Sequence, residues 1–447
     1  LPEITGPAVI DASTHPGYAG APLIALDGTG IGHENGFVIT AGSTTVRGFA
    51  IYRFSNFGIW LRDCNNNVIQ GNHIGVDAAG SVARPNRQGI VLINSSNNLI
   101  GGTTAAARNV ISGNTIHGLE IGGSSNVVQG NFIGTNSTGT AAIGNGIHGV
   151  VISGAPFTNN LIGGASPGAG NLISGNQRGI SIEAPGNVIQ GNLIGTDVTG
   201  TNRIPNHTGI DAVGPNTLIG GLTPAARNVV SANGDGVVFS GSGSKLQGNF
   251  IGTDITGTLA LGNSGNGVIA SGNALIGGTV PEARNVISGN GIFGNVSLRS
   301  NGTAAGSTVQ GNYIGIDVTG TRALSESTGP GITVFGPNNL IGGVVTGSRN
   351  VISGNLAGIQ LGSFNAGPAQ GNLIQGNLIG LNALGTGPLP NIEGGIEFFD
   401  AFNNTVGGTQ TEAANKIAFN GGRASGSPGE RATRFAGIRF FQTAVWE

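Results

Sequence analysis

The stretch QGNFIGTNSTGT at 129–140 returns three more times with few changes, as QGNLIGTDVTGT at 190–201, QGNFIGTDITGT at 247–258 and QGNYIGIDVTGT at 310–321. A phrase copied this faithfully is either a binding site repeated many times or the framework of the fold. The distinction bears on function, because a repeated framework carries its chemistry at the positions where the copies differ.

A second phrase alternates with the first: LIGGTTAAARNVISGN at 99–114 has counterparts at 218–233, 275–290 and 340–355. Between the two phrases lies a four-residue signature, a glycine followed by alternating apolar residues. This signature recurs about thirteen times, from GIWL at 58 to GIRF at 437. The underlying period is therefore about 30 residues, and the longer repeat contains two such units.

Each of these units contains three short runs that alternate apolar with other residues, as in GLEI, NVVQGN and FIGT. Such runs can turn one face inward as β-strands, and none shows the apolar stripe of a helix. The sequence therefore predicts an all-β, single-domain parallel β-helix, a solenoid with three short strands per coil and about 13 coils. We expect an N-terminal cap with the first coils at 1–57, regular coils at 58–420, and an irregular segment with the last coil at 421–447.

Glycine and asparagine separate the strand runs, and both suit the corners of a solenoid. Glycine adopts left-handed backbone conformations freely and asparagine tolerates them, while stacked asparagine side chains can hydrogen-bond along the axis. The pattern resembles the parallel β-helix repeat family of bacterial secreted proteins. That family shares the right-handed β-helix fold of pectate lyases, polygalacturonases, phage tailspikes and adhesins. The resemblance covers nearly the whole chain from about Gly58 onward and implies the fold.

The composition limits the possible partners. The chain has 86 glycines, 9% charged residues and a net charge of -2 with only two lysines. It therefore offers no basic stripe for nucleic acid or an anionic membrane, and no apolar run is long enough to span a bilayer. The sequence contains no methionine, which predicts a processed chain, and with the resemblance this favours a secreted or cell-surface protein. We expect no helical cap at the C-terminal end, where end-to-end pairing of subunits is one possible arrangement.

The resemblance implies a protein that acts on polysaccharide, most plausibly a glycoside hydrolase, although the known catalytic patterns of the fold are missing. The sequence has no Asp-Asp pair, no Arg-x-Lys and no cluster of acidic residues, which argues against a pectinase. The alternative is a non-catalytic adhesin or structural carbohydrate-binding solenoid. Reducing-sugar release from a panel of glycans separates the two.

Candidate site residues follow from the facing of the signature strands. The second and fourth residues of each signature are apolar and should point inward, so the third should point outward. Polar side chains then gather on one outward face around the fifth and sixth coils, which in related enzymes is commonly the substrate groove. We expect the substrate-binding residues there to be Glu120, Arg178, Ser181 and His207.

The same face provides a candidate pair of catalytic carboxyl groups. Glu183 lies two residues beyond Ser181, and Asp211 occupies the position equivalent to Ser181 one coil later. Strand spacings place their Cα atoms about 8 Å apart, which is compatible with a glycosidase pair. We expect Asp211 to act as base or nucleophile and Glu183 as acid.

No cofactor is expected. The acidic residue of the first phrase, for example Asp77 or Asp197, could form a calcium ladder, but two of its six copies are asparagine, at Asn136 and Asn382. That substitution favours a capped turn over a metal site. The arginines of the second phrase, such as Arg108 and its counterparts, are expected to bond carbonyls of their own turns.

Overall fold

The computed structural model describes residues 1–154, 156–299, 306–324, 328–362 and 369–421, and the backbone of 434–436 and 439–440. The chain divides into two compact units, Leu1–Thr217 with Ala225–Asn228 (unit 1) and Leu218–Pro224 with Val229–Glu447 (unit 2). In both units each coil contributes one strand to each of three parallel sheets. We call these the signature sheet, the glutamine sheet and the short sheet.

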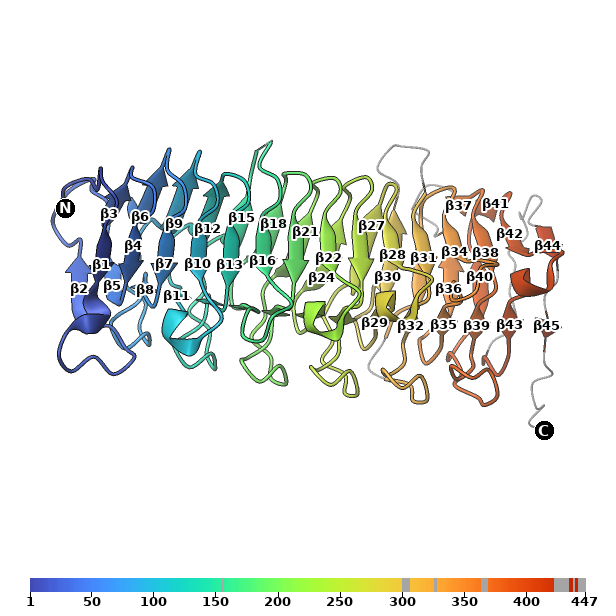
Figure 1. Ribbon diagram of the computed structural model, residues 1–447. Helices are drawn as coiled ribbons and strands as arrows, with labels where there is room; N and C mark the ends of the chain where they lie inside the picture. The colour runs from blue at the N-terminus through green and yellow to red at the C-terminus, as the bar shows by residue number, and fades with distance from the viewer. Residues whose placement is uncertain are drawn as a thin grey trace. The chain divides into compact units, whose positions relative to one another are not determined.

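Unit 1 builds each sheet from seven described strands, coloured from blue to green in Figure 1. The signature sheet contains β3 (Phe37–Ile39), β6 (Phe57–Arg62), β9 (Gln88–Ile93), β12 (His117–Gly122), β15 (His148–Ile152), β18 (Arg178–Ile182) and β21 (Thr208–Ala212). The glutamine sheet contains β1 (Val9–Asp11), β4 (Thr45–Arg47), β7 (Val68–Gln70), β10 (Leu99–Gly101), β13 (Val127–Gln129), β16 (Leu161–Gly163) and β19 (Val188–Gln190). The short sheet contains β2 (Ile24–Asp27), β5 (Phe49–Tyr52), β8 (His73–Ile74), β11 (Val110–Ile111), β14 (Phe132–Ile133), β17 (Leu172–Ile173) and β20 (Leu193–Ile194).

Unit 2 repeats the same arrangement. Its signature sheet contains β24 (Asp235–Phe239), β27 (Val268–Ser271), β30 (Val296–Arg299), β33 (Ile332–Val334), β36 (Ile359–Leu361) and β40 (Ile396–Phe398). Its glutamine sheet contains β22 (Leu218–Gly220), β25 (Lys245–Gln247), β28 (Leu275–Gly277), β31 (Thr308–Gln310), β34 (Leu340–Gly342), β38 (Leu373–Gln375), β42 (Thr405–Gly407) and β44 (Arg434–Ala436). Its short sheet contains β23 (Val229–Val230), β26 (Phe250–Ile251), β29 (Val286–Ile287), β32 (Tyr313–Ile314), β35 (Val351–Ile352), β39 (Leu378–Ile379), β43 (Lys416–Ile417) and β45 (Arg439–Phe440).

The remaining elements lie in the turns. A small pair of strands, β37 (Ala369–Gln370) and β41 (Ala401–Phe402), lies beside the coils of unit 2. The helical elements of the described residues are single 3-10 turns: η1 (Ala12–Thr14), η2 (Ala105–Ala107), η3 (Pro224–Ala226), η4 (Pro281–Ala283) and η5 (Thr411–Ala413). The predicted parallel β-helix with three strands per coil is confirmed.

The core consists of inward apolar ladders, as the alternation predicts. In the signature sheet Ile180 pairs with Ile210, and both are completely buried. In the glutamine sheet the middle residue of each strand is buried, so that Ile69, Ile100 and Val128 lie in register. Burial of such side chains is the main favourable term of folding.

Buried asparagines form hydrogen-bonded ladders at the three corners of unit 1. At the corner before the short sheet, Asn109 donates its Nδ2 hydrogen to Asn131 Oδ1 at 2.9 Å, and Asn131 does the same to Asn171 at 3.0 Å. The same oxygen also accepts the backbone N–H of the preceding asparagine, at 3.3 Å for Asn109. Equivalent ladders run through Asn98 and Asn126, and through Asn114 and Asn145. The structure therefore confirms that stacked asparagine side chains hydrogen-bond along the axis of unit 1.

The repeated phrase is framework. The glutamine of QGN donates from Nε2 to a glycine carbonyl of the next coil at 2.9 Å, as Gln70 does to Gly101. The following glycine has a left-handed backbone, with φ +65° at Gly130, and a Cβ there would lie 2.0 Å from the carbonyl oxygen of Gly102. Each letter of QGN therefore has a structural role, which answers the question raised by its repetition.

The long turns that follow the phrase stack on each other, two coils apart. In unit 1 Ser137 N–H bonds to Gly80 O at 2.8 Å and Val198 N–H bonds to Gly139 O at 3.0 Å. The arginines act differently from the prediction. Arg108 Nε bonds to a carbonyl, but it is that of Gly130 in the next coil, because the guanidinium lies 4.1 Å from the ring centroid of Phe132.

The signature sheet begins with β3, in a stretch that lacks the regular signature but was expected to hold the first coils, and β3 pairs with β6. One detail of the predicted strand order is wrong. The copy at GIRF 437 does not join that sheet, because Arg439 pairs with Lys416 of the short sheet. The boundaries at 57 and 421 stay predictions. Residues 422–433, 437–438 and 441–447 of the irregular segment lie outside the described residues.

The asparagine ladder gives a direct stability test. Asn131→Ala removes the acceptor of two buried N–H groups of Asn109. At ~1–3 kcal/mol for each unsatisfied buried group, we expect the free energy of unfolding to fall by about 2–6 kcal/mol. Urea unfolding followed by circular dichroism measures it. The control Asn202→Ala changes an exposed turn asparagine whose counterpart in another copy is Ala141, and equal losses for both variants would refute the ladder's importance.

Candidate functional site

The predicted site residues lie on consecutive signature strands of unit 1. Glu120 of β12 pairs with Val151 of β15, which pairs with Ser181 of β18, and Ser181 pairs with Asp211 of β21. The residues on either side of Ser181 and Asp211 in each strand are buried and inward-facing. We therefore place Glu120, Ser181 and Asp211 in one outward column of the sheet.

Arg178 and Asp211 form an ion pair across adjacent strands. Arg178 Nε lies 3.6 Å from Asp211 Oδ2, and the two side chains are 49% and 21% exposed. Burial raises the pKa of the Asp211 carboxyl above its ordinary value, and the Arg178 charge offsets part of that rise. A carboxyl group with a raised pKa on an outward face is the kind of group that can deliver a proton.

Glu183 lies just beyond the end of β18 and is exposed. Its backbone N–H bonds to Ile152 O at 2.9 Å, which continues the pairing of β15 with β18. Asp211 pairs with Ser181, as the sequence spacing predicted. Ser181 lies two residues before Glu183 on the same chain segment. The role of the two carboxyl groups as a catalytic pair stays a prediction.

The other predicted contacts differ in accessibility. His207 is exposed and lies one residue before β21, with its N–H bonded to Asn176 O at 3.2 Å. Glu120 is half-buried, whereas Ser181 is only 4% exposed because neighbouring side chains cover it. Glu120 and His207 can therefore meet a ligand at the surface, and Ser181 is better suited to supporting its neighbours.

Sequence reasoning missed a stacked pair of histidines on this sheet. His117 and His148 pair across β12 and β15, with ring centroids 4.8 Å apart and planes only 5° from parallel. His148 in turn pairs with Arg178. Their Nδ1 atoms and the Nε2 atom of His148 are buried and have no hydrogen-bond partner among the described residues. The available signal was the residue before each signature glycine, which reads His, His and Arg in successive coils.

An aromatic side chain also lies on this sheet, although the stretch around Asp211 has none. Trp60 of β6 occupies the same column, in register with Val91 and so with Glu120. Phe57 meets it edge to face at 5.6 Å, and the Arg62 guanidinium lies 4.8 Å from its ring centroid. Tryptophan is a common platform for the apolar face of a ligand.

The acidic residues of the long turns are engaged within their own turns. Asp197 Oδ1 accepts the Thr199 hydroxyl at 2.7 Å, and Oδ2 accepts the Asn202 amide at 2.8 Å. Burial alone raises the pKa of Asp197, but these hydrogen bonds outweigh it and the pKa is lowered. The described residues contain no group of three or more His, Cys, Asp and Glu side chains placed to hold a metal ion. In the same residues, no helix has the length and hydrophobicity to cross a membrane.

By sequence, the chain matches no known protein family and no characterised protein. Among solved structures it is similar to the Dettilon tailspike protein gp208, at 15% identity and a TM-score of 0.36, over 92% of this chain and 68% of that one. It is also similar to the PL6 family polysaccharide lyase Pedsa3628 from Pseudopedobacter saltans, at 10% identity and a TM-score of 0.26, over 95% and 94%. A third is the A-module of the mannuronan C-5 epimerase AlgE6 from Azotobacter vinelandii, at 12% identity and a TM-score of 0.19, over 98% and 90%. Likenesses this low carry no argument about activity.

The histidine pair predicts an acid-sensitive stability. Burial, then the neighbouring His117 and Arg178, lowers the pKa of His148 to about 4, from an ordinary value of 6.5. The folded state disfavours the charged form of His148. Its contribution to the free energy of unfolding is therefore fully present above pH ~6.5 and is lost as pH falls toward ~4. Burial, and to a smaller extent the Arg87 charge, also lowers the pKa of His117.

We therefore expect the free energy of unfolding to fall between pH ~6.5 and ~4, and to fall less in His148→Phe, which keeps an aromatic ring in the stack but cannot titrate. Urea unfolding at a series of pH values checks this. An unchanged pH dependence in the variant would contradict the assignment.

Proposed function

We propose that the outward face of the signature sheet in unit 1 binds a polysaccharide and hydrolyses it, with Asp211 and Glu183 as the two reacting carboxyl groups. The observation that carries the proposal is the half-buried Asp211 carboxyl, with a raised pKa, beside the half-exposed Arg178. We infer a secreted or cell-surface protein of bacterial type, in line with the resemblance of its repeats.

The raised pKa of Asp211 favours it as the acid, in place of the role of base or nucleophile expected from the sequence. A protonated Asp211 gives its proton to the glycosidic oxygen as the bond from that oxygen to the anomeric carbon breaks. Glu183 takes a proton from water as the water oxygen bonds to that carbon. The products are two shorter chains, one with a new reducing end, so atoms and charge balance.

The remaining polar groups of the face would orient the sugar chain. Arg178 is half-exposed and can donate to sugar hydroxyls while it faces Asp211. His207, just before β21, is exposed, and Glu120 of β12 is half-buried. The stacked His117 and His148 rings are mostly neutral at pH 7, because burial lowers the pKa of both imidazoles.

The alternative is a binding protein without turnover. It is favoured by the low exposure of Ser181 and Val151, which lie between Glu120 and Asp211 in the same column. A shallow, partly apolar surface can hold a glycan without placing it against two carboxyl groups. Release of reducing sugar decides between the two proposals.

We expect wild-type protein to release reducing ends from at least one member of a panel of plant, algal and bacterial glycans. Asp211→Asn and Glu183→Gln should each lower that rate about 10²-fold or more, the usual range for an acid or base. Asp77→Asn is a matched control, because Asn136 occupies its position in the next copy. Glycan binding without release of reducing sugar, or full activity in both variants, would contradict the hydrolase proposal and support the binding protein without turnover.

The pH profile tests the role of Arg178. Activity should fall as pH rises through the pKa of Asp211, because the proton to be donated is lost. The Arg178 charge lowers that pKa, so Arg178→Gln should move the alkaline limb of kcat/KM to higher pH. A limb that stays in place, or moves to lower pH, would mean that Asp211 is not the titrating acid.

A further inference from the structure

The copy of the second phrase at 405–420, in unit 2, departs from the other five at several positions. The first strand residue is leucine in five copies, Leu99, Leu161, Leu218, Leu275 and Leu340, but threonine in the sixth, Thr405. The sixth residue of the phrase is Thr104, Ser166, Thr223, Val280 or Val345 in the other copies, but Gln410 in this one.

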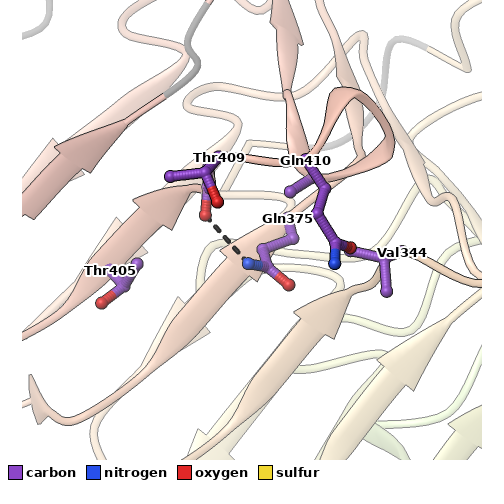
Figure 2. Close-up of a pocket in the computed structure, with 8 residues that line it drawn as sticks. Val344, Gln375, Thr405, Thr409 and Gln410 are labelled. Carbon is purple, nitrogen blue, oxygen red and sulfur yellow. Dashed lines mark hydrogen bonds between the residues drawn. The ribbon is translucent and has the colours of Figure 1, made fainter.

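Two of these departures line a single cavity of about 360 Å³. Its lining residues are Val344, Gln375, Thr405, Gly407, Gly408, Thr409, Gln410 and Ala413. Figure 2 shows the side chains of Thr405, Gln375 and Gln410 around this space, with Val344 on one side. The volume lies within the range of small-molecule sites.

One substitution and one shared glycine leave room for this cavity. Thr405 pairs with Leu373 in the glutamine sheet, and its side chain has one heavy atom fewer than the leucine of the other copies. Gly408 is glycine in all six copies, and a Cβ there would lie 3.0 Å from Gln375 Nε2 and 2.7 Å from the Ala413 methyl. The strand pairing is unchanged by the threonine.

The polar groups of the cavity are uncharged, and one of them is fixed by a hydrogen bond. Gln375 donates from Nε2 to Gly407 O at 2.9 Å (Figure 2), which leaves its Oε1 as an acceptor. Gln410 precedes η5 but makes no side-chain cap bond, so its amide is available as donor and acceptor. Thr405 and Thr409 add two hydroxyl groups, and Val344 and Ala413 add apolar contact.

We propose that this cavity is a binding site for a neutral sugar residue, separate from the face that carries Asp211. Amides and hydroxyls that both donate and accept match sugar hydroxyls, while aliphatic groups match the C–H face of a ring. None of the eight described residues that line the cavity is charged, so these residues offer no counter-charge to a carboxylate or a phosphate. The inference does not depend on hydrolysis by unit 1.

The test is titration calorimetry of the whole chain with the methyl glycosides of glucose, galactose and mannose, and with glucuronate as the charged comparison. We expect at least one neutral glycoside to bind and glucuronate to bind more weakly. Thr405→Leu restores the residue of the other five copies, so it should fold normally while filling the cavity. It should weaken binding at least about tenfold.

One further variant makes the result specific. Thr308→Leu changes the same residue type at the first position of β31, which does not line the cavity, and should bind like wild type. No binding by any neutral glycoside, equal binding in Thr405→Leu, or the same loss of binding in Thr308→Leu would each overturn the inference.

Discussion

Buried carboxamides stacked at the corners hold the coils in register. In unit 1, Asn131 Oδ1 accepts both the backbone N–H and the Nδ2 hydrogen of Asn109, and Asn131 passes the same pair of bonds to Asn171. A corner cannot satisfy its own backbone groups by strand pairing, and an unpaired buried N–H is costly. The asparagine side chain supplies the missing partner, so the position of each coil is fixed by the next.

This constraint separates framework from function. The inward ladders and the corner amides cannot vary without loss of stability, whereas the outward positions of the strands can. On the signature sheet of unit 1 those positions carry Trp60, Glu120, His148, Arg178 and Asp211 in neighbouring coils. The framework brings residues about 30 positions apart to neighbouring strands, and chemistry can be placed on it without altering its fold.

Much of the fold could be predicted from the sequence, because period, alternation and corner residues each have a direct physical meaning. Apolar alternation identified Ile180 and Ile210 as inward residues, and both are fully buried. Alternation did not identify His117 and His148 as outward residues. Simple alternation would turn the residue before the signature glycine inward. In the structure the glycine itself faces inward, and a Cβ at Gly118 would lie 2.8 Å from Asn145 Nδ2. The histidine is thereby left on the outer face. The cavity at Thr405 was equally hidden, since it needs substitutions that meet only when coils stack.

Amide hydrogen exchange in unit 1 tests the framework account most directly. If the asparagine ladder fixes the coils, the backbone amides of Asn109 and Asn131 should exchange only through the largest opening of the unit and rank among its slowest. The amide of Thr201, in an exposed turn, should exchange far faster. Ladder amides that exchange as quickly as that turn would show that the corners open freely, and that some other interaction holds the coils in register.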